Sequence, residues 1–411
     1  MPYIAIENVN VIDGQGGLIA NATVRVGDSI IQEVSTAADL KPSAQNYEII
    51  DGRGRWLMPG LVNCHDHLLN KSLRTIEDGS TDATAVKAWR MQMFLSSPGY
   101  LALECAKNAQ WELEQGVTTI RELGGPAVPD QVSPPYTNVD LRDAIASGLK
   151  GPRILACRLA ITMTGGHGHP WYGIREADGT EEVRKAVREQ LKGGADVIKI
   201  MSSAGTANYP HEHPGMTEFT VEELRVAVEE AHRRETPVTT HAMSNEAVRN
   251  ALLVGIDTIE HGFLINDEMV RMMAGDGTSF VPTATVCKRI ATSGSGPMAE
   301  LFGKALPGYG ERILKALEIG VPVGVGTDSR HTMLEEMQTL SGFGMASTDV
   351  LTAATSVGAK ICGVSKTGIV AEGYIADLIL LDSNPLDDLT KAFQNVSLVM
   401  KEGQVVVDSQ Q

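Results

Sequence analysis

The sequence predicts an α/β protein: a (β/α)₈ TIM barrel with a small composite β-sandwich domain formed by both termini. Three observations support this. Eight apolar runs of strand length alternate with helical patterns, both ends of the chain show short strands without helical patterns, and 411 residues exceed the roughly 250 that such a barrel needs. We expect residues 1–58 and 365–411 to form the sandwich and residues 59–364 the barrel.

The two ends of the chain share a pattern of short strands separated by turns. The strand-like runs cover residues 3–8, 22–26, 30–34, 377–382, 396–401 and 404–407. Turn signals follow at Asp13-Gly14, Gly16-Gly17 and Glu402-Gly403. Both ends therefore predict all-β structure.

The middle of the chain alternates between two patterns. The apolar runs cover residues 57–65, 117–122, 153–159, 196–201, 238–241, 258–261, 279–283 and 323–327. The helical patterns cover residues 100–114, 181–192, 221–234, 245–254, 267–273 and 348–360. Thr220 and Glu223 have capping-box spacing, which marks the start of one helix. Strands that alternate with helices predict a parallel sheet, and eight of them predict closure into a barrel.

Three long connections follow barrel strands, at residues 70–99, 165–179 and 202–219. Long loops in a compact domain are usually functional, and loops after barrel strands form the catalytic face. The proline and glycine residues of 294–310 predict a further irregular segment.

Composition limits the partners and the compartment. Lys+Arg 35 against Asp+Glu 51 gives a net charge of −16, which argues against nucleic acid and anionic membranes as partners. We expect a soluble, cytoplasmic protein, because no signal-peptide pattern and no apolar stretch near the roughly 18 residues of a membrane span is evident. The five cysteines have no CxxC spacing, so they predict neither a disulfide framework nor a thiolate zinc site.

Histidines end several of the predicted strands. His65 and His67 lie two residues apart, which places both imidazoles on one face of a strand, with Asp66 pointing the other way. His241 and His261 end two later runs. A lone histidine is more often a satisfied core residue, but two in register on successive strands favour a site for zinc or a related ion.

Lys199 and Asp328 complete the pattern. Lys199 lies inside an apolar strand, where an unpaired ammonium would cost several kcal/mol or lose its proton. A buried ion pair, a Schiff-base nucleophile and a carbamate formed with CO₂ each explain a lysine there, and the histidine pairs favour the carbamate. Asp328 ends the eighth strand, where a carboxylate can bind a metal and move protons during hydrolysis, or cap the next helix.

As an ordered set, these residues resemble the amidohydrolase superfamily in its binuclear, carboxylated-lysine form. The matching segments are MPGLVNCHDH at 58–67, VIKI at 197–200, THA at 240–242, IEHG at 259–262, GTDS at 326–329 and GYIADL at 373–378. The similarity is greatest to the imidazolonepropionase-like and Xaa-Pro or Xaa-Arg dipeptidase-like group, which includes ochratoxin-hydrolysing carboxypeptidases. GGHGH at 165–169 and the EHG of 260–262 carry that finer resemblance.

The resemblance implies two divalent metal ions, with zinc expected and Mn²⁺ or Co²⁺ also compatible. His65 and His67 would hold the buried ion, His241 and His261 the exposed one, and a carbamate on Lys199 would bridge them. Asp328 would complete the buried site and act as general base and acid for a metal-bridging hydroxide. The substrate would be a small molecule with a peptide-like, N-acyl amino acid or aryl amide bond, and the enzyme a homo-oligomer.

The same resemblance suggests contacts with the substrate. The candidate residues are His167, His169, Tyr209, Met243 and His331. His167 would be the second catalytic residue, contacting the carbonyl group, or else a loop histidine that orders the glycine turn. Relatives often carry His-Ala-Tyr where this chain has His241, Ala242 and Met243, so an apolar group would suit this pocket better than a free carboxylate.

Other functions fit the pattern less well. Deaminases of similar type carry a glutamate where this chain has Ser244, and they lack the bridging lysine. A non-enzymatic scaffold would have no use for six ligands and a buried lysine. Hydrolysis of a cyclic amide, a carbamate, a urea or a lactone would use the same ligands, so the sequence leaves these reactions open.

Overall fold

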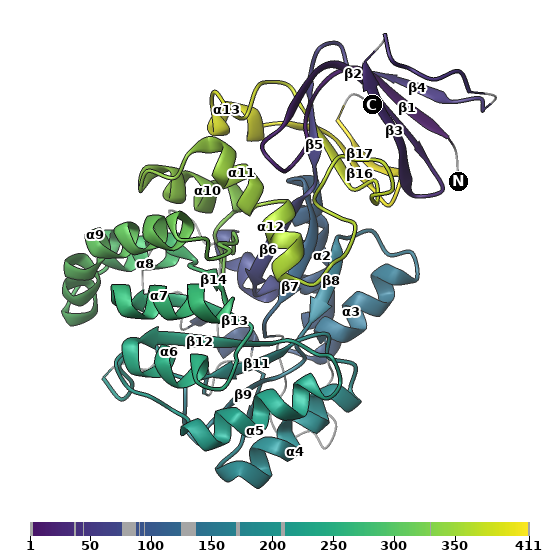
Figure 1. Ribbon diagram of the computed structural model, residues 1–411. Helices are drawn as coiled ribbons and strands as arrows, with labels where there is room; N and C mark the ends of the chain where they lie inside the picture. The colour runs from purple at the N-terminus through teal and green to yellow at the C-terminus, as the bar shows by residue number, and fades with distance from the viewer. Residues whose placement is uncertain are drawn as a thin grey trace.

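The computed structural model describes residues 3–36, 38–43, 45–75, 88–89, 91–93, 95–124, 137–169, 173–206, 210–328 and 330–409. Within them, a β-rich region formed by both ends of the chain adjoins a larger region of strands and helices (Figure 1). The mixed α/β content that the sequence predicts is confirmed. Among the described residues, no helix is both long enough and apolar enough to cross a membrane.

One sheet combines strands from both ends of the chain. Its members are β1 (Ile4–Ile12), β2 (Leu18–Gly27), β3 (Ile30–Thr36), β4 (Glu48–Asp51), β5 (Trp56–Pro59), β15 (Leu378–Leu381), β16 (Val396–Lys401) and β17 (Gln404–Asp408). The order β17-β16-β15-β5-β1-β2-β3 joins the two ends where β15 pairs antiparallel with β5. The ladders show this sheet, whereas its packing as a sandwich stays a prediction.

The predicted run of residues 57–65 divides between two sheets. Residues up to Pro59 belong to β5, and β6 (Leu61–Asp66) pairs in parallel with β7 (Val117–Glu122). Gly60 lies between them, and a Cβ atom there would come within 2.2 Å of the Thr118 side chain. The crossing from one sheet to the other therefore needs glycine at this position.

The central strands are parallel and form two ladders. One contains β6, β7 and β8 (Arg153–Ala156). The other contains β10 (Ile174–Glu176), β9 (Ala160–Thr162), β11 (Ile198–Met201), β12 (Val238–Ser244), β13 (Thr258–Leu264) and β14 (Ser279–Val281). The predicted run of 153–159 is thus interrupted between β8 and β9, where Arg158 has a positive φ of 63°. The short strand β10 lies inside a segment for which the sequence predicts a loop.

Residues 322–327 form no ladder, although they lie beside two strands. The amide of Phe280 donates to the carbonyl of Pro322, and the amide of Cys64 donates to the carbonyl of Val325. The amide of Thr327 in turn donates to the carbonyl of His65. These bonds place the segment that carries Asp328 against the strand that carries His65. Closure of the strands into an eight-stranded barrel stays a prediction.

Helices follow most of the central strands. Their bounds are η1 (Leu68–Thr75), α2 (Pro98–Glu114), α3 (Thr137–Ala146), α4 (Gly179–Lys192), α5 (Val221–His232), α6 (Asn245–Leu252), α7 (Asp267–Asp276), α8 (Ala284–Ser293), α9 (Pro297–Glu318), α10 (Met333–Gly342), α11 (Ser347–Ala353), α12 (Ser356–Ile361) and α13 (Leu389–Phe393). The capping box of Thr220 and Glu223 at the start of α5 is confirmed. The helix expected over 348–360 is divided between α11 and α12.

The expectation of an irregular segment at 294–310 is wrong, because most of it belongs to the 22-residue helix α9. The helix contains Pro307, which ordinarily breaks the hydrogen-bond ladder. Phe302, Tyr309 and Ile313 are nonetheless buried in the main hydrophobic core. Burial of this apolar face outweighs the local preference of proline and glycine.

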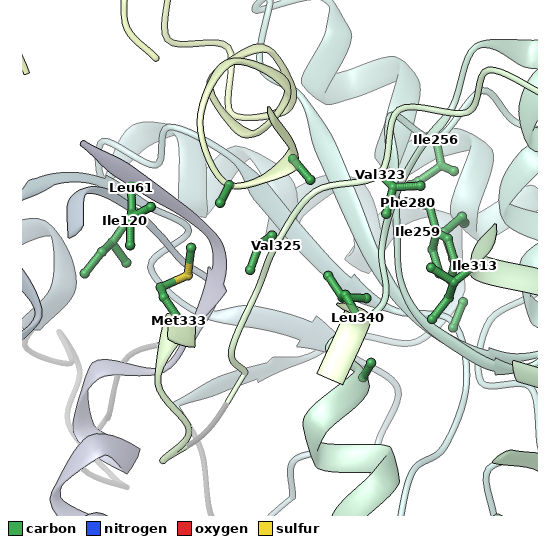
Figure 2. Packing of buried hydrophobic residues seen from close by; sticks show 14 of the residues in the cluster. Leu61, Ile120, Ile256, Ile259, Phe280, Ile313, Val323, Val325, Met333 and Leu340 are labelled. Carbon is green, nitrogen blue, oxygen red and sulfur yellow. The ribbon is translucent and has the colours of Figure 1, made fainter. Parts of the chain in front are cut away.

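The main core lies between the parallel strands and the helices. Figure 2 shows Leu61 and Ile120 of neighbouring strands on one side and Ile256, Ile259 and Phe280 on the other. A second cluster, which includes Ile6, Val24 and Leu380, lies in the terminal sheet. The core holds the strands in place, and their carboxyl ends carry the polar residues described next.

Candidate metal centre

All six predicted ligands line one cavity. It encloses about 960 Å³, counting space continuous with solvent. The ligand residues that line it are His65, His67, Lys199, His241, His261 and Asp328. They come from β6, its extension, β11, β12, β13 and the segment after residue 327. Parallel strands bring their carboxyl ends to one edge, which explains why residues so distant in sequence converge.

Asp328 lies between the two histidines of the His-x-His motif. Its Oδ1 atom is 3.3 Å from Nε2 of His65 and 3.3 Å from Nε2 of His67. Burial acts to raise the pKa of Asp328, but contacts with both imidazoles outweigh it and hold the pKa well below its usual range. A carboxylate and two imidazole nitrogens thus face one point, as a divalent ion requires.

His241 and His261 form the opposite side of the group. Their ring centroids are 4.5 Å apart, and the His261 ring is 5.0 Å from that of His65. His65, His261 and Asp328 each offer one ligand atom within 4.8 Å of the others. Burial lowers the pKa of His241 and of His261 well below the usual value, which keeps both imidazoles neutral and able to bind a metal.

The backbone at the site is held in unusual conformations. His261 has a φ of 71°, Thr283 of 48° and Asp328 of 60°. Such left-handed conformations are uncommon for residues other than glycine, and they persist only where surrounding contacts enforce them. Here Thr283 Oγ1 lies 2.7 Å from His261 Nδ1, and the hydroxyl of Tyr309 lies 2.7 Å from the His261 carbonyl.

Lys199 is fully buried on β11 and faces the same cavity. Burial lowers the pKa of its amine, although Glu260 and Asp328 act in the opposite direction. The amine is therefore more readily deprotonated than an exposed lysine, and an uncharged amine is the form that reacts with CO₂.

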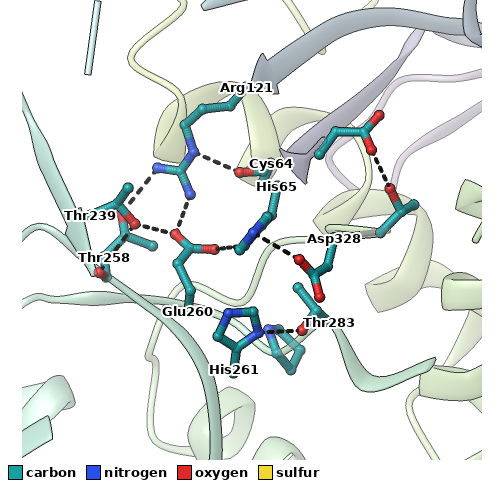
Figure 3. A network of polar contacts seen from close by, with 12 residues as sticks. Cys64, His65, Arg121, Thr239, Thr258, Glu260, His261, Thr283 and Asp328 are labelled. Carbon is teal, nitrogen blue, oxygen red and sulfur yellow. Dashed lines mark hydrogen bonds and ion pairs between the residues drawn. The ribbon is translucent and has the colours of Figure 1, made fainter. Parts of the chain in front are cut away.

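Buried charged side chains contact the predicted ligands on the side that faces away from the cavity. Figure 3 shows the Glu260 carboxylate between the Arg121 guanidinium and the His65 imidazole. The distances are 2.7 Å from Arg121 Nη2 to Oε1 and 2.7 Å from His65 Nδ1 to Oε2. Burial acts to raise the pKa of Glu260, but Arg121 and His65 bring it down to about 2.

Lys71 links the two segments that carry the buried ligands. Its Nζ atom lies 3.3 Å from Oδ1 of Asp66 and 2.9 Å from Oγ1 of Thr327, and it donates to the carbonyl of His331. Glu112 lies 3.0 Å away on α2. Asp66 therefore faces away from the cavity, as its place between the two histidines predicts. Its contact with Lys71 ties β6 to the loop of Asp328.

The structure distributes the predicted substrate contacts unevenly. His167 and Met243 line the cavity, and the His167 ring stacks on that of His241 at 4.1 Å. His169 is half exposed beside Glu176, and His331 is buried near Glu335. Neither is among the residues that line the cavity. Tyr209 lies outside the described residues.

One wall of the cavity is apolar and comes from α8 and α9. It consists of Val286, Cys287, Ile290 and Phe302. The Phe302 ring stacks on Phe263 of β13 with centroids 4.3 Å apart, which fixes the wall relative to the strand that carries His261. An apolar wall beside a polar floor suits a substrate with a hydrophobic group next to a polar bond.

Sequence reasoning missed several of these residues. Glu260 lies in the IEHG segment of residues 259–262. A charged residue in an apolar strand indicates that it has a partner. Glu122 is the acidic neighbour of Arg121 in the sequence, but the structure pairs Arg121 with Glu260. Glu122 instead accepts from the amides of Leu68 and Gly124. Neighbours on a strand point to opposite faces, which explains the difference.

Comparisons with known proteins agree with this geometry. The model of the amidohydrolase family matches residues 56–406. Ochratoxinase of Aspergillus niger is 31% identical over 423 residues, covering 94% of this chain and 82% of the relative. Imidazolonepropionase of Idiomarina loihiensis is 26% identical over 424 residues, covering 94% and 93%.

Solved structures show the same similarity. The crystal structure of A. niger ochratoxinase matches with a TM-score of 0.85 and 26% identity, covering 99% of this chain and 96% of that one. A Xaa-Pro dipeptidase with bound methionine in the active site matches with a TM-score of 0.82 and 27% identity, covering 98% and 99%.

Proposed function

Because this chain belongs to the amidohydrolase family, we propose that it is a metal-dependent hydrolase that cleaves an amide bond of a small, partly apolar substrate. The observation that carries the proposal is the convergence of the six predicted ligands on one cavity, from β6 and its extension, β11, β12, β13 and the segment of Asp328. The relatives support it, since ochratoxinase and a Xaa-Pro dipeptidase are among them.

The donor set fits two divalent ions. Neutral imidazoles and a carboxylate suit zinc, which we expect as the native metal. His65, His67 and Asp328 would hold one ion, and His241 with His261 the other. Two ions bound there would lower the pKa of water and polarise a carbonyl group.

Lys199 would supply the ligand between the two groups. Its deprotonated amine would attack CO₂, forming an N–C bond and releasing one proton, which leaves an anionic carbamate. Burial favours the uncharged amine that this step needs. Divalent ions held by the neighbouring imidazoles would supply the positive charge that an anionic carbamate needs.

Asp328 would transfer the proton of the reaction. Its carboxylate would take a proton from the attacking water and deliver it to the leaving nitrogen when the C–N bond breaks. The low pKa of Asp328 keeps it ionised before the reaction starts. His167, which lies over His241, would hydrogen-bond the carbonyl oxygen of the substrate.

The apolar wall and Met243 would select the substituent on the amide. Val286, Ile290 and Phe302 offer a hydrophobic surface beside the predicted ligands. We therefore expect aryl amides and N-acyl derivatives of apolar amino acids among the substrates. Carbamates, ureas and lactones remain the alternative substrates on the same site.

The structure gives a reason to prefer amide hydrolysis over deamination. Ser244 occupies the position of the deaminase glutamate, and its hydroxyl caps α6 by accepting from the amide of Ala247. A residue committed to a helix cap is not free to move protons at the substrate.

We further propose the architecture that the sequence predicts: a closed barrel over residues 59–364 and a terminal sandwich over residues 1–58 and 365–411. The hydrogen bonds of residues 322–327 to β14 and β6 support closure, since they place this segment between those strands as the eighth strand position of a barrel. We also expect a homo-oligomer without nucleic acid or membrane partners.

A substrate panel tests the proposal. Metal-reconstituted enzyme would be assayed on N-acyl amino acids, Xaa-Pro and Xaa-Arg dipeptides, aryl amides, carbamates, ureas and lactones, with bound metal measured in the same sample. We expect turnover of amides that carry an apolar group. Turnover confined to lactones, or none despite two bound ions, would contradict amide hydrolysis.

A further inference from the structure

A buried chain of polar contacts runs from Arg121 through Glu260 to His65 (Figure 3). All three side chains are almost completely buried. His65 Nδ1 lies 2.7 Å from Glu260 Oε2, and His65 Nε2 faces Asp328 Oδ1 at 3.3 Å. The two nitrogens of this imidazole therefore face opposite environments, a carboxylate on one side and the cavity on the other.

The contact with Glu260 requires a proton on one particular nitrogen of the His65 imidazole. A carboxylate only accepts hydrogen bonds, so His65 must carry its proton on Nδ1 to donate to it. Nε2 is then the nitrogen that faces the predicted ligand Asp328 and the cavity, where a bound metal ion would take the place of a proton. In the other tautomer, Nε2 would carry the proton and could bind no metal.

The Glu260 carboxylate is itself held in one orientation. Its Oε1 atom accepts from Arg121 Nη2 at 2.7 Å and from the hydroxyl of Thr239, which leaves Oε2 for His65. Arg121 is anchored in turn, because its Nε donates to the Cys64 carbonyl at 2.6 Å. Cys64 directly precedes His65, so this contact ties the guanidinium to the same strand as the imidazole.

We propose that Glu260, oriented by Arg121, is a positioning residue that holds His65 in the tautomer able to bind a metal ion through Nε2. This inference rests on the metal site of the proposed function. It adds a residue for which the sequence alone suggests no role. Hydrogen-bonded partners of this kind typically change metal affinity by 10–100-fold when removed.

The substitution Glu260→Gln tests the proposal with almost no change in volume. The Arg121 guanidinium can only donate to Oε1, so the glutamine oxygen would face it. The amide NH₂ would then point at His65 Nδ1 and donate to it, which drives the imidazole proton to Nε2. We expect the first equivalent of Zn²⁺ to bind 10–100-fold more weakly, as measured by competition with a chromophoric chelator.

Asp377→Asn is the matched control. Asp377 is also buried, and its Oδ2 atom lies 2.7 Å from Arg153 Nη1, so the change removes an ion pair of the same length. It lies at the terminal sheet and is absent from the residues that line the cavity. We expect Zn²⁺ affinity within about two-fold of the wild type in this variant, with thermal melting used to compare the loss of stability in both.

The wild-type protein provides a second readout, in which a variant serves only to assign a signal. In metal-free enzyme labelled with ¹⁵N-histidine, His65 should show a protonated Nδ1, with signals assigned by their loss in His65→Asn. An unprotonated Nδ1 in the wild type would overturn the proposal. Equal loss of affinity in Glu260→Gln and Asp377→Asn would also overturn it.

Failure of the proposed function would look different. Wild-type enzyme that binds no Zn²⁺ in the chelator competition would contradict the metal site itself. Wild-type enzyme that binds Zn²⁺ normally, together with unchanged affinity in Glu260→Gln, would contradict the role of Glu260 alone.

Discussion

Lys199 is the residue whose environment most limits its chemistry. A lysine buried on a strand and facing a cavity with five histidines has a lowered pKa and cannot act as a solvated cation. Reaction with CO₂ would replace the amine by an anionic carbamate, which could act as a ligand together with the predicted ligands around it. The prediction for this residue therefore concerns metal content as well as activity.

Lys199→Ala should lose most of its bound metal and most of its activity. Short carboxylates such as acetate or propionate should restore part of both, because they can occupy the space of the carbamate. Metal content and turnover would be measured with and without added carboxylate. Full activity without any rescue agent would contradict a carbamate on Lys199.

Asp328→Asn should slow turnover by at least ~10²-fold, because an amide cannot accept the proton that a carboxylate takes from water. The expected loss is in kcat, measured at saturating Zn²⁺ because Asp328 is also a predicted ligand. Near-normal turnover in this variant would assign the base to another residue.

Glu336 gives a prediction about pH. It is fully buried and accepts from the amides of Ala284 and Thr285, and burial raises its pKa from 4.5 to about 7. A carboxyl group with a higher pKa in the folded state binds more protons when folded, so stability falls as pH rises from about 4.5 to about 7. The loss approaches roughly 3 kcal/mol.

The melting temperature of the chelated protein at pH 5 and pH 8 measures this effect. The wild type should lose more stability between these values than Glu336→Gln, which has no proton to lose. Chelation removes the separate pH dependence of metal binding. Equal losses in both proteins would contradict the raised pKa of Glu336.

At the scale of elements, α9 packs in the core and contacts the candidate metal centre. Its Tyr309 hydroxyl lies 2.7 Å from the His261 carbonyl and 2.6 Å from that of Pro282. These contacts hold a backbone in which His261 and Thr283 have positive φ angles. The helix therefore stabilises the conformation that aims His261 into the cavity.

Tyr309→Phe should destabilise the fold by about 1–3 kcal/mol, because it leaves buried carbonyl groups without their donor. It should also weaken metal binding, since His261 loses the contact that fixes its backbone. Chelator competition and thermal melting would measure both. Tyr47→Phe is the control, because Tyr47 donates to Gln32 in the terminal sheet, and it should leave metal affinity unchanged.

The sequence was sufficient for some elements and insufficient for others, for physical reasons. The His-x-His spacing and the buried Lys199 were recognisable because charged or ligating residues are rare in apolar strands. Helix α9 was not, because Pro307 and its neighbouring glycines oppose a helix locally and only burial of Phe302 and Tyr309 overcomes them. The pairing of Arg121 with Glu260 joins residues 139 positions apart, which no local pattern reveals.

At the scale of the whole molecule, the strand ends bring the predicted ligands from distant segments to one cavity while the terminal sheet packs elsewhere (Figure 1). The order of these ligands along the chain was predictable, and their convergence agrees with it. Which buried side chains contact the predicted ligands depends on the register of neighbouring strands, such as the pairing of His241 with Glu260. The homo-oligomer stays a prediction that light scattering would check.

Titration of metal-free enzyme with Zn²⁺ tests the central claim most directly. Amide hydrolysis would be followed as metal is added to chelated protein, in the presence of bicarbonate as the source of CO₂. We predict no turnover without metal and a rise that saturates at two equivalents per chain. Full turnover of the chelated protein, or saturation at one equivalent of Zn²⁺, would contradict a binuclear hydrolase.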